Sequence, residues 1–195
     1  MRILKTRLFA IILVFVLLFS RSAWETRVPI IPAVLFLAGL HLGAIAALGR
    51  LWCSLYIAGH KDATLIQQGP YSLCRNPLYF FSFLGAIGVG MATGTFTVPV
   101  LLAVSFLLYY PSVIGNEEAK LREMFPDQFD DYCARVPRFF PKRLNFEEPK
   151  SCDVNPVTYR KHIMSALWFV WIIGWLGFVV QLHGWGLVPV FFRLY

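Results

Sequence analysis

The stretch Val28-Pro-Ile-Ile-Pro-Ala-Val-Leu-Phe-Leu-Ala-Gly-Leu-His-Leu-Gly-Ala-Ile-Ala-Ala-Leu48 contains 21 residues and no formally charged side chain. A helix that crosses the hydrocarbon core of a bilayer needs about 20 predominantly apolar residues. The composition of the whole chain agrees, because 57% of its 195 residues are hydrophobic and only 15% are charged, whereas ordinary soluble domains carry about 25% charged residues. The sequence therefore predicts an all-α, polytopic membrane protein.

Four further apolar stretches are candidate membrane spans. Pro77–Phe96, Val98–Gly115 and Ile163–Leu182 contain 18 to 20 residues each, whereas Leu8–Phe19 contains 12 residues after a basic start. The short stretch fits either the hydrophobic region of a signal peptide or a retained helix that spans a locally thinned bilayer. Because the residues before Ala23 make a poor cleavage site, we expect a retained helix and about five transmembrane helices in one domain.

The distribution of positive charge predicts the orientation of these spans. If the N-terminus is cytoplasmic, 15 of the 18 Lys and Arg residues fall in cytoplasmic segments, as the positive-inside rule requires. This orientation places the polar segments Arg50–Asn76 and Asn116–His162 together on the cytoplasmic face. The net charge of +7 then faces the cytoplasm beside the membrane, and we expect no nucleic-acid partner.

Two patterns are poor evidence for a cofactor or metal site. Gly85, Gly88, Gly90 and Gly94 resemble part of a dinucleotide-binding fingerprint, but that fingerprint requires a strand, a turn and a helix N-terminus. These glycines lie in an apolar stretch, where small residues let helices approach closely. The four cysteines show no paired Cys-x-x-Cys spacing, so we expect neither a metal site nor a disulfide framework.

The first polar motif is Gly69-Pro-Tyr-Ser-Leu-Cys-Arg-Asn-Pro-Leu-Tyr79. Its Gly-Pro pair predicts a turn, and Pro77 suits the first position of the next helix. The start of that helix, where the dipole and free N–H groups favour an anion, then gathers Tyr71, Arg75, Asn76 and Tyr79. The alternative is an interfacial anchor, in which the arginine contacts lipid phosphate and the tyrosines lie in the aromatic belt.

The second motif is Asn116-Glu-Glu118, at the cytoplasmic end of the fourth apolar stretch. Acidic residues at a helix C-terminus are disfavoured by the helix dipole. If the helix continues instead, the two carboxylates point about 100° apart, so that one can face a site and the other water or a basic partner. A carboxylate at this position can bind an ammonium group or act as a base, and the alternative is a solvated helix end.

The third motif runs from Phe125 to Pro141. Phe125, Phe129, Tyr132 and Val136 recur at i, i+4, i+7 and i+11, which predicts an amphipathic helix that lies on the membrane or covers the cytoplasmic face. The following Val-Pro-Arg-Phe-Phe-Pro segment ends that helix and contains Arg138, for which contact with lipid phosphate is the alternative role.

In their order and spacing, the three motifs resemble those of the isoprenylcysteine carboxyl methyltransferase and phospholipid methyltransferase superfamily of integral membrane enzymes. Members carry Gly-Pro-Tyr-x-x-x-Arg-(His or Asn)-Pro-x-Tyr, a helical hairpin, Glu-Glu-x-x-Leu and a Phe-to-Pro segment, which match residues 48–141 here. Residues 1–47 then form N-terminal spans and residues 163–182 an additional C-terminal span. The chain departs from the pattern at four positions, which are Asn76 for the usual His, Val113 for a frequent Arg, Pro126 for Gly and Phe129 for Tyr.

The resemblance implies that S-adenosylmethionine binds in a cytoplasmic pocket covered by a helical cap. It implies that the cofactor carboxylate is held at the start of the helix after the first motif, that its ammonium or ribose contacts the acidic pair, and that tyrosine rings lie near its sulfonium or adenine. The implied cofactor-binding residues are Tyr71, Arg75, Asn76, Pro77, Tyr79, Glu117 and Glu118.

The resemblance leaves the chemistry of the methyl acceptor open. A carboxylate acceptor needs a cation to orient it, and Arg138 is the candidate. An amine acceptor has to lose a proton, and Glu118 is then the candidate base. These two residues are the expected catalytic ones.

We therefore expect methyl transfer to a lipidic or prenylated acceptor, most like isoprenylcysteine carboxyl O-methylation, with N-methylation of a phospholipid or another lipid amine as the alternative. A sterol-type NADPH reductase has a related core, but the residues provide no site for a second phosphate. A non-enzymatic scaffold would have lost the arginine and glutamate positions, which are all present. The stretch from Arg50 to Lys61 looks like that of bacterial members, which implies a bacterial inner membrane with the active site facing the cytoplasm.

Overall fold

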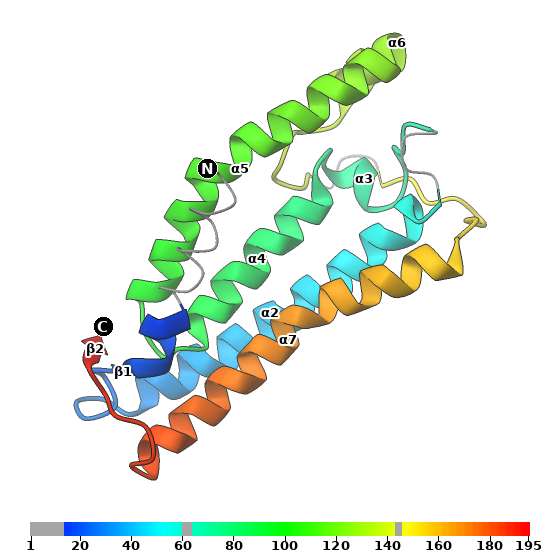
Figure 1. Cartoon of the computed structure of the whole chain (residues 1–195). Helices are drawn as coiled ribbons and strands as arrows, with labels where there is room; N and C mark the ends of the chain where they lie inside the picture. Colours follow the sequence, from blue (N-terminus) through cyan, green and yellow to red (C-terminus); the bar gives the residue numbers. More distant parts are fainter. Residues whose placement is uncertain (1–13, 60–63, 143–145) are drawn as a thin grey trace.

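The computed structural model describes residues 14–59, 64–142 and 146–195. Helices dominate it, as predicted, together with two strands of three residues each (Figure 1). Residues 14–19 are helical, and the elements that follow are β1 (Ser20–Ser22), α2 (Ile30–Ile57), α3 (Pro70–Leu73), α4 (Pro77–Met91), α5 (Thr97–Met124), α6 (Pro126–Arg135), α7 (Pro156–Gly184) and β2 (Phe192–Leu194).

The long helices form a bundle in which α2 packs against α4 and α7, and α4 also packs against α5 (Figure 1). Glycines allow the closest of these approaches. A Cβ atom added to Gly39 would lie 2.5 Å from the carbonyl oxygen of Gly88 on α4, so neither position tolerates a side chain. The predicted role of Gly88 in helix packing is confirmed. Gly94 differs, because it has φ +70° in the turn after α4.

The structure changes the predicted count of membrane spans. Among the described residues, α2, α5 and α7 are long and apolar enough to cross a membrane. The α4 helix has only 15 residues, because the chain turns at Gly94 before the predicted end at Phe96. Most of Leu8–Phe19 lies outside the described residues. The membrane class is supported, and the number of about five spans is not confirmed.

The α5 helix does not end with the apolar stretch at Gly115. It continues through Pro111 and the acidic pair as far as Met124, since the residues after Gly115 are mostly good helix formers such as Glu, Ala, Lys, Leu and Arg. Glu117 and Glu118 therefore lie within a helix that projects beyond α4 and carries α6 at its end (Figure 1). The interpretation of the pair as a solvated helix end is wrong.

At the opposite end of the bundle, two segments distant in sequence pair as parallel strands. Ser20 of β1 lies opposite Phe192 of β2, and the backbone N–H of Ala23 donates to the carbonyl oxygen of Leu194 at 2.7 Å. His183 Nε2 lies 3.0 Å from the carbonyl oxygen of Leu18, so α7 joins the same arrangement. The sequence analysis did not predict these strands.

Candidate active site

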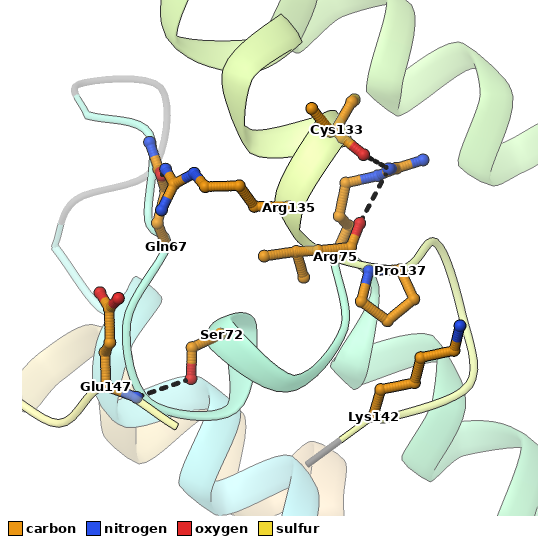
Figure 2. A pocket seen from close by; sticks show the side chains of 10 residues that line it. Gln67, Ser72, Arg75, Cys133, Arg135, Pro137, Lys142 and Glu147 are labelled. Carbon is orange, nitrogen blue, oxygen red and sulfur yellow. Dashed lines mark hydrogen bonds between the residues drawn. The ribbon is translucent and has the colours of Figure 1, made fainter. Parts of the chain in front are cut away.

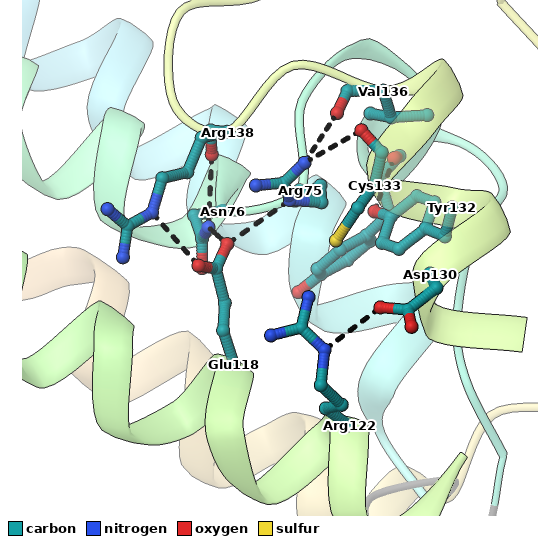
Figure 3. A network of polar contacts seen from close by, with 10 residues as sticks. Arg75, Asn76, Glu118, Arg122, Asp130, Tyr132, Cys133, Val136 and Arg138 are labelled. Atoms are coloured by element: carbon teal, nitrogen blue, oxygen red, sulfur yellow. Dashed lines mark hydrogen bonds and ion pairs between the residues drawn. The ribbon is translucent and has the colours of Figure 1, made fainter. Parts of the chain in front are cut away.

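The three polar motifs meet at the carboxylate of Glu118 on α5 (Figure 3). Arg75 Nε and Asn76 Nδ2 donate to Oε1 at 3.2 and 3.0 Å, and Arg138 Nε donates to Oε2 at 2.9 Å. The side chains of Glu118 and Arg75 are only 15% and 13% exposed. Charge-assisted hydrogen bonds of this kind are stronger than neutral ones, so Glu118 links α5 to the segments before α4 and after α6.

Arg75 also holds the C-terminal end of α6. Its Nη1 donates to the carbonyl oxygens of Cys133 at 3.1 Å and Val136 at 3.0 Å. The last carbonyl groups of a helix lack partners in the helix and carry partial negative charge, so the guanidinium stabilises this helix end. Among the described residues, only Nη2 of the three guanidinium nitrogens has no protein acceptor.

Asn76 fixes the segment that follows α6. Its Nδ2 donates a second hydrogen bond to the carbonyl oxygen of Arg138 at 3.0 Å, and the backbone N–H of Arg75 donates to the carbonyl oxygen of Pro137 at 2.9 Å. Asn76 is buried. The residue that departs from the usual His of carboxyl methyltransferases therefore holds the carboxylate of Glu118 and the backbone at Arg138 together.

Glu117 contacts a different part of the site from Glu118. It is exposed, and its Oε2 accepts a hydrogen bond from the hydroxyl of Tyr79 at 2.8 Å. The ring of Tyr110 lies edge-on to Tyr79, with 5.5 Å between the centroids, and stacks on Phe106 at 3.8 Å. The two adjacent carboxylates thus point to different partners, as expected for neighbours in a continuous helix.

Tyr71 lies outside the Glu118 network. Its carbonyl oxygen accepts a hydrogen bond from the hydroxyl of Tyr132 at 2.7 Å. Burial raises the pKa of Tyr71 well above its ordinary value and also raises the pKa of Tyr132. Burial likewise raises the pKa of the Cys74 thiol to about 12. These groups stay neutral at physiological pH and support the packing of α6 against the first motif.

A cavity of about 250 Å³ borders Arg75 on the side of α3 and the end of α6 (Figure 2). Arg135 Nη2 donates to Gln67 Oε1 at 2.9 Å at its edge, and the backbone N–H of Glu147 donates to Ser72 Oγ at 3.1 Å. The sequence analysis missed this cavity, because its lining comes from separate segments that share no motif. The polar side chains that line it are Gln67, Ser72, Arg75, Arg135, Lys142 and Glu147.

The structure thus brings most of the predicted site residues together. Arg75, Asn76, Glu118 and Arg138 form one network, and Tyr79 and Glu117 form an adjacent pair. Pro77 begins α4 as predicted.

Comparisons with known proteins identify the family of this chain. A family model described as phospholipid methyltransferase matches residues 31–128, half of the chain. The chain belongs to the phospholipid methyltransferase family. A protein-S-isoprenylcysteine O-methyltransferase of Schizosaccharomyces pombe is 32% identical over 82 residues, which are 42% of this chain and 35% of that protein. The resemblance to the wider superfamily is therefore confirmed.

Two proteins named for metal resistance are similar over most of the chain. The nickel-cobalt-cadmium resistance protein NccN of Alcaligenes xylosoxydans xylosoxydans is 37% identical over 159 residues, 82% of this chain and 73% of that protein. The cobalt-zinc-cadmium resistance protein CzcN of Cupriavidus metallidurans is 40% identical over 154 residues, 79% of this chain and 70% of that protein. Their names describe a resistance and no reaction. No solved structure matches the chain.

Proposed function

We propose that this phospholipid methyltransferase family member transfers a methyl group from S-adenosylmethionine to a lipidic acceptor at the cytoplasmic face of a bacterial inner membrane. Family membership supports a membrane methyltransferase. The observation that carries the proposal is the meeting of three separate motifs at Glu118, which places two further residues, Tyr79 and Glu117, beside the same helix start.

The chemistry of these residues fits the cofactor. S-adenosylmethionine, when bound, supplies a methyl group on a positively charged sulfur and also carries a carboxylate, an ammonium group and an adenosine. The exposed carboxylate of Glu117 suits the ammonium or the ribose hydroxyls. Nη2 of Arg75 and the N–H groups in the first turn of α4 suit the carboxylate. The polar cavity beside Arg75 offers a route for a soluble molecule.

The aromatic side chains provide orientation and exclude water. The hydroxyl of Tyr79 donates to Glu117, and the ring of Tyr110 lies edge-on to the ring of Tyr79. A cation held against an aromatic face is stabilised by about 0.5 to 2 kcal/mol. Phe106 and Phe139 extend the apolar wall, with 6.1 Å between their centroids. Rates of displacement reactions depend strongly on alignment of the reactants, and a rigid aromatic wall next to a fixed carboxylate provides that alignment.

The geometry favours Glu118 as an anchor over Glu118 as a base. Its two oxygens already accept three hydrogen bonds, and a proton would have to compete with the two arginines. Arg138, exposed and bound to Glu118 through Nε alone, retains other N–H groups with which to orient an acceptor carboxylate. We therefore propose O-methylation of a carboxylate, and the family model for phospholipid methyltransferases favours N-methylation of a lipid amine as the second candidate.

The decisive experiment is titration of S-adenosylhomocysteine into the purified protein in lipid nanodiscs. We expect micromolar binding that Arg75→Ala and Glu117→Ala both lose. Matched controls are Arg160→Ala and Glu123→Ala, two exposed residues away from the network. Absence of binding by the folded wild-type protein would refute the proposed cofactor.

The acceptor class follows from the product formed with labelled methyl donor and membrane lipids. A methyl ester releases labelled methanol in base, whereas an N-methyl group does not. Base-labile label would support the carboxylate, and base-stable label in a phospholipid would support the second candidate.

A further inference from the structure

Arg50 carries a charge that the described protein does not neutralise. It lies in α2 two residues beyond the apolar stretch, and its guanidinium reaches two other helices of the bundle. Nη1 donates to Ser82 Oγ on α4, and Nη2 donates to Ser165 Oγ on α7 at 3.0 Å. The guanidinium carbon also lies 5.9 Å from the ring centroid of Phe169. The third nitrogen, Nε, is buried and finds no acceptor among the described residues.

No carboxylate in the described parts of the chain forms an ion pair with this arginine. The titratable groups that interact with it electrostatically are Cys53, Tyr71 and Tyr110, and thiols and phenols are ordinarily neutral at pH 7. Two serine hydroxyls satisfy hydrogen bonds but contribute no opposite charge. Arg50 is therefore a cation held inside the bundle without an anion.

A partly buried guanidinium without a counterion lowers the stability of the fold unless a ligand supplies the negative charge. An arginine cannot lose its proton in a protein, and charged residues at membrane depth are rare and mark functional sites. An arginine near a helix end usually extends towards the membrane surface. Here the side chain instead turns inward to Ser82 and Ser165, which hold its planar fork in the bundle.

The position of Arg50 relative to the Glu118 network indicates which ligand reaches it. Ser82 lies five residues into α4 from Pro77, or about 7.5 Å along the axis at 1.5 Å per residue. Tyr79 lies between the two levels on the same helix, and Tyr110 interacts with both Tyr79 and Arg50. Arg50 is thus the cation on the membrane side of the proposed cofactor site, whereas Arg75 and Arg138 on the cap side are paired with Glu118.

We propose that Arg50 is a specificity-determining residue that pairs with the negatively charged group of a membrane-soluble acceptor, a carboxylate or a phosphate. The inference rests on the proposed function and extends it, because it adds Arg50 on the membrane side as a second cation for the acceptor's negative charge, beside Arg138 on the cap side. Ser82 and Ser165 hold the guanidinium so that the remaining N–H groups of Nη1 and Nη2 are available to the incoming anion. An acceptor without negative charge then leaves the partly buried charge of Arg50 unpaired and binds more weakly.

The test measures binding of charged and neutral probe pairs to the full chain in nanodiscs. The first pair is S-farnesyl-N-acetylcysteine and its carboxamide, and the second is phosphatidate and diacylglycerol in phosphatidylcholine nanodiscs. We expect wild-type protein to bind one anionic probe at least tenfold more tightly than its neutral counterpart. Arg50→Gln should remove that preference, Arg50→Lys should keep part of it, and the exposed control Arg160→Gln should keep all of it.

S-adenosylhomocysteine binding, measured on the same samples, separates this inference from the proposed function. We expect its affinity to stay within twofold of wild type in every Arg50 variant, which also shows that the variants fold. If Arg50→Gln does not fold, Arg50→Lys and Ser165→Ala test the inference in its place. We then expect each of these variants to reduce the preference for the anionic probe over its neutral counterpart severalfold. Equal binding of both members of each pair by wild type, or a preference that survives in the folded variants, would overturn the inference. A preference that depends on Arg50 without any S-adenosylhomocysteine binding would refute the cofactor alone.

Discussion

Arg75 and Arg50 are two arginines largely enclosed by the same small bundle, and they have opposite surroundings. Arg75 contacts the carboxylate of Glu118 and two carbonyl oxygens at the end of α6. Arg50 contacts two serine hydroxyls and an aromatic ring. In the first arrangement a carboxylate already balances the charge and Arg75 holds the cap on the bundle, whereas in the second no acidic side chain among the described residues balances the charge of Arg50. The comparison indicates that Arg75 stabilises the fold, whereas the unpaired charge of Arg50 lowers the stability of the fold.

The largest effect is expected when the carboxylate shared by the cap is removed. Glu118→Gln leaves Arg75 and Arg138 without their acid, and breaking a buried ion pair by removing one partner costs about 3 to 5 kcal/mol. We expect a marked fall in the thermal unfolding midpoint and loss of S-adenosylhomocysteine binding. The matched control is Glu123→Gln, on the exposed face of the same helix, which should change neither. Equal midpoints for the two variants would contradict the assignment of Glu118 as the anchor.

The comparison between the two arginines is tested directly by replacing each with Met. Arg75→Met should destabilise the protein by about 2 to 3 kcal/mol, because the end of α6 and Glu118 lose a charged hydrogen-bond partner. Arg50→Met should be neutral within about 1 kcal/mol or stabilising, because an apolar side chain of similar length replaces a charge without a counterion. Denaturant unfolding in mixed micelles measures both values.

Hydrogen exchange of residues 126–138 supplies a second measurement on the same variants. It should become faster in Arg75→Met alone. The exposed ion pair of Arg122 and Asp130 provides the reference, because these side chains are 57% and 66% exposed. Ion pairs on the surface contribute little to stability, so Arg122→Met should leave the free energy of unfolding nearly unchanged. An Arg50→Met variant that is as destabilised as Arg75→Met would contradict the proposed difference between the two arginines.

A smaller effect is expected at Tyr79. Tyr79→Phe removes one hydroxyl that donates to Glu117 at 2.8 Å but keeps the ring beside Tyr110. A hydrogen bond to a charged group is worth about 1.5 to 3 kcal/mol when buried, and the exposure of Glu117 reduces that value. We expect S-adenosylhomocysteine to bind roughly fivefold more weakly, with an unchanged unfolding midpoint. Tyr109→Phe, on the exposed face of α5, is the control.

The smallest effect near neutral pH is expected at Cys74. Burial raises the pKa of its thiol from an ordinary value of 9.0 to about 12, so the folded protein holds this proton more tightly than the unfolded chain does. The group therefore has no effect on stability below about pH 9 and weakens folding as the pH rises from 9 towards 12. At pH 8.5, iodoacetamide should label exposed Cys152 and leave Cys74 unmodified, as peptide mass spectrometry would show. Equal labelling of the two in the folded protein would disprove this.

The sequence was sufficient for the parts of the molecule that depend on local pattern. Apolar stretches of about 20 residues indicated membrane helices, and the spacing of Phe125, Phe129, Tyr132 and Val136 predicted α6, which runs from Pro126 to Arg135. Ordered motifs indicated that Arg75, Glu118 and Arg138 share a site, and the structure places them in one network. Their individual roles toward a cofactor remain predictions.

The parts that depend on long-range contacts could not be predicted. The pairing of Ser20–Ser22 with Phe192–Leu194 joins segments of no evident strand pattern, and nothing in a single sequence indicates which segments meet. The sequence singles out Arg50 only as the start of a stretch that looks like that of bacterial family members, because the environment of its guanidinium depends on the positions of Ser82 and Ser165. The apolar stretch ends at Gly115 but α5 continues to Met124, because hydrophobicity marks where an apolar stretch ends, whereas helix propensity decides where a helix ends.

The length of α5 indicates how far the site lies from the opposite boundary of the membrane. Glu117 lies 20 residues after the start of the helix at Thr97, and 20 residues rise about 30 Å. That distance equals the thickness of a bilayer's hydrocarbon core. A helix that starts at one boundary of the core thus places its acidic pair at the other boundary. The proposed water-soluble methyl donor could reach this boundary from the aqueous side and the proposed lipid-soluble acceptor from the bilayer.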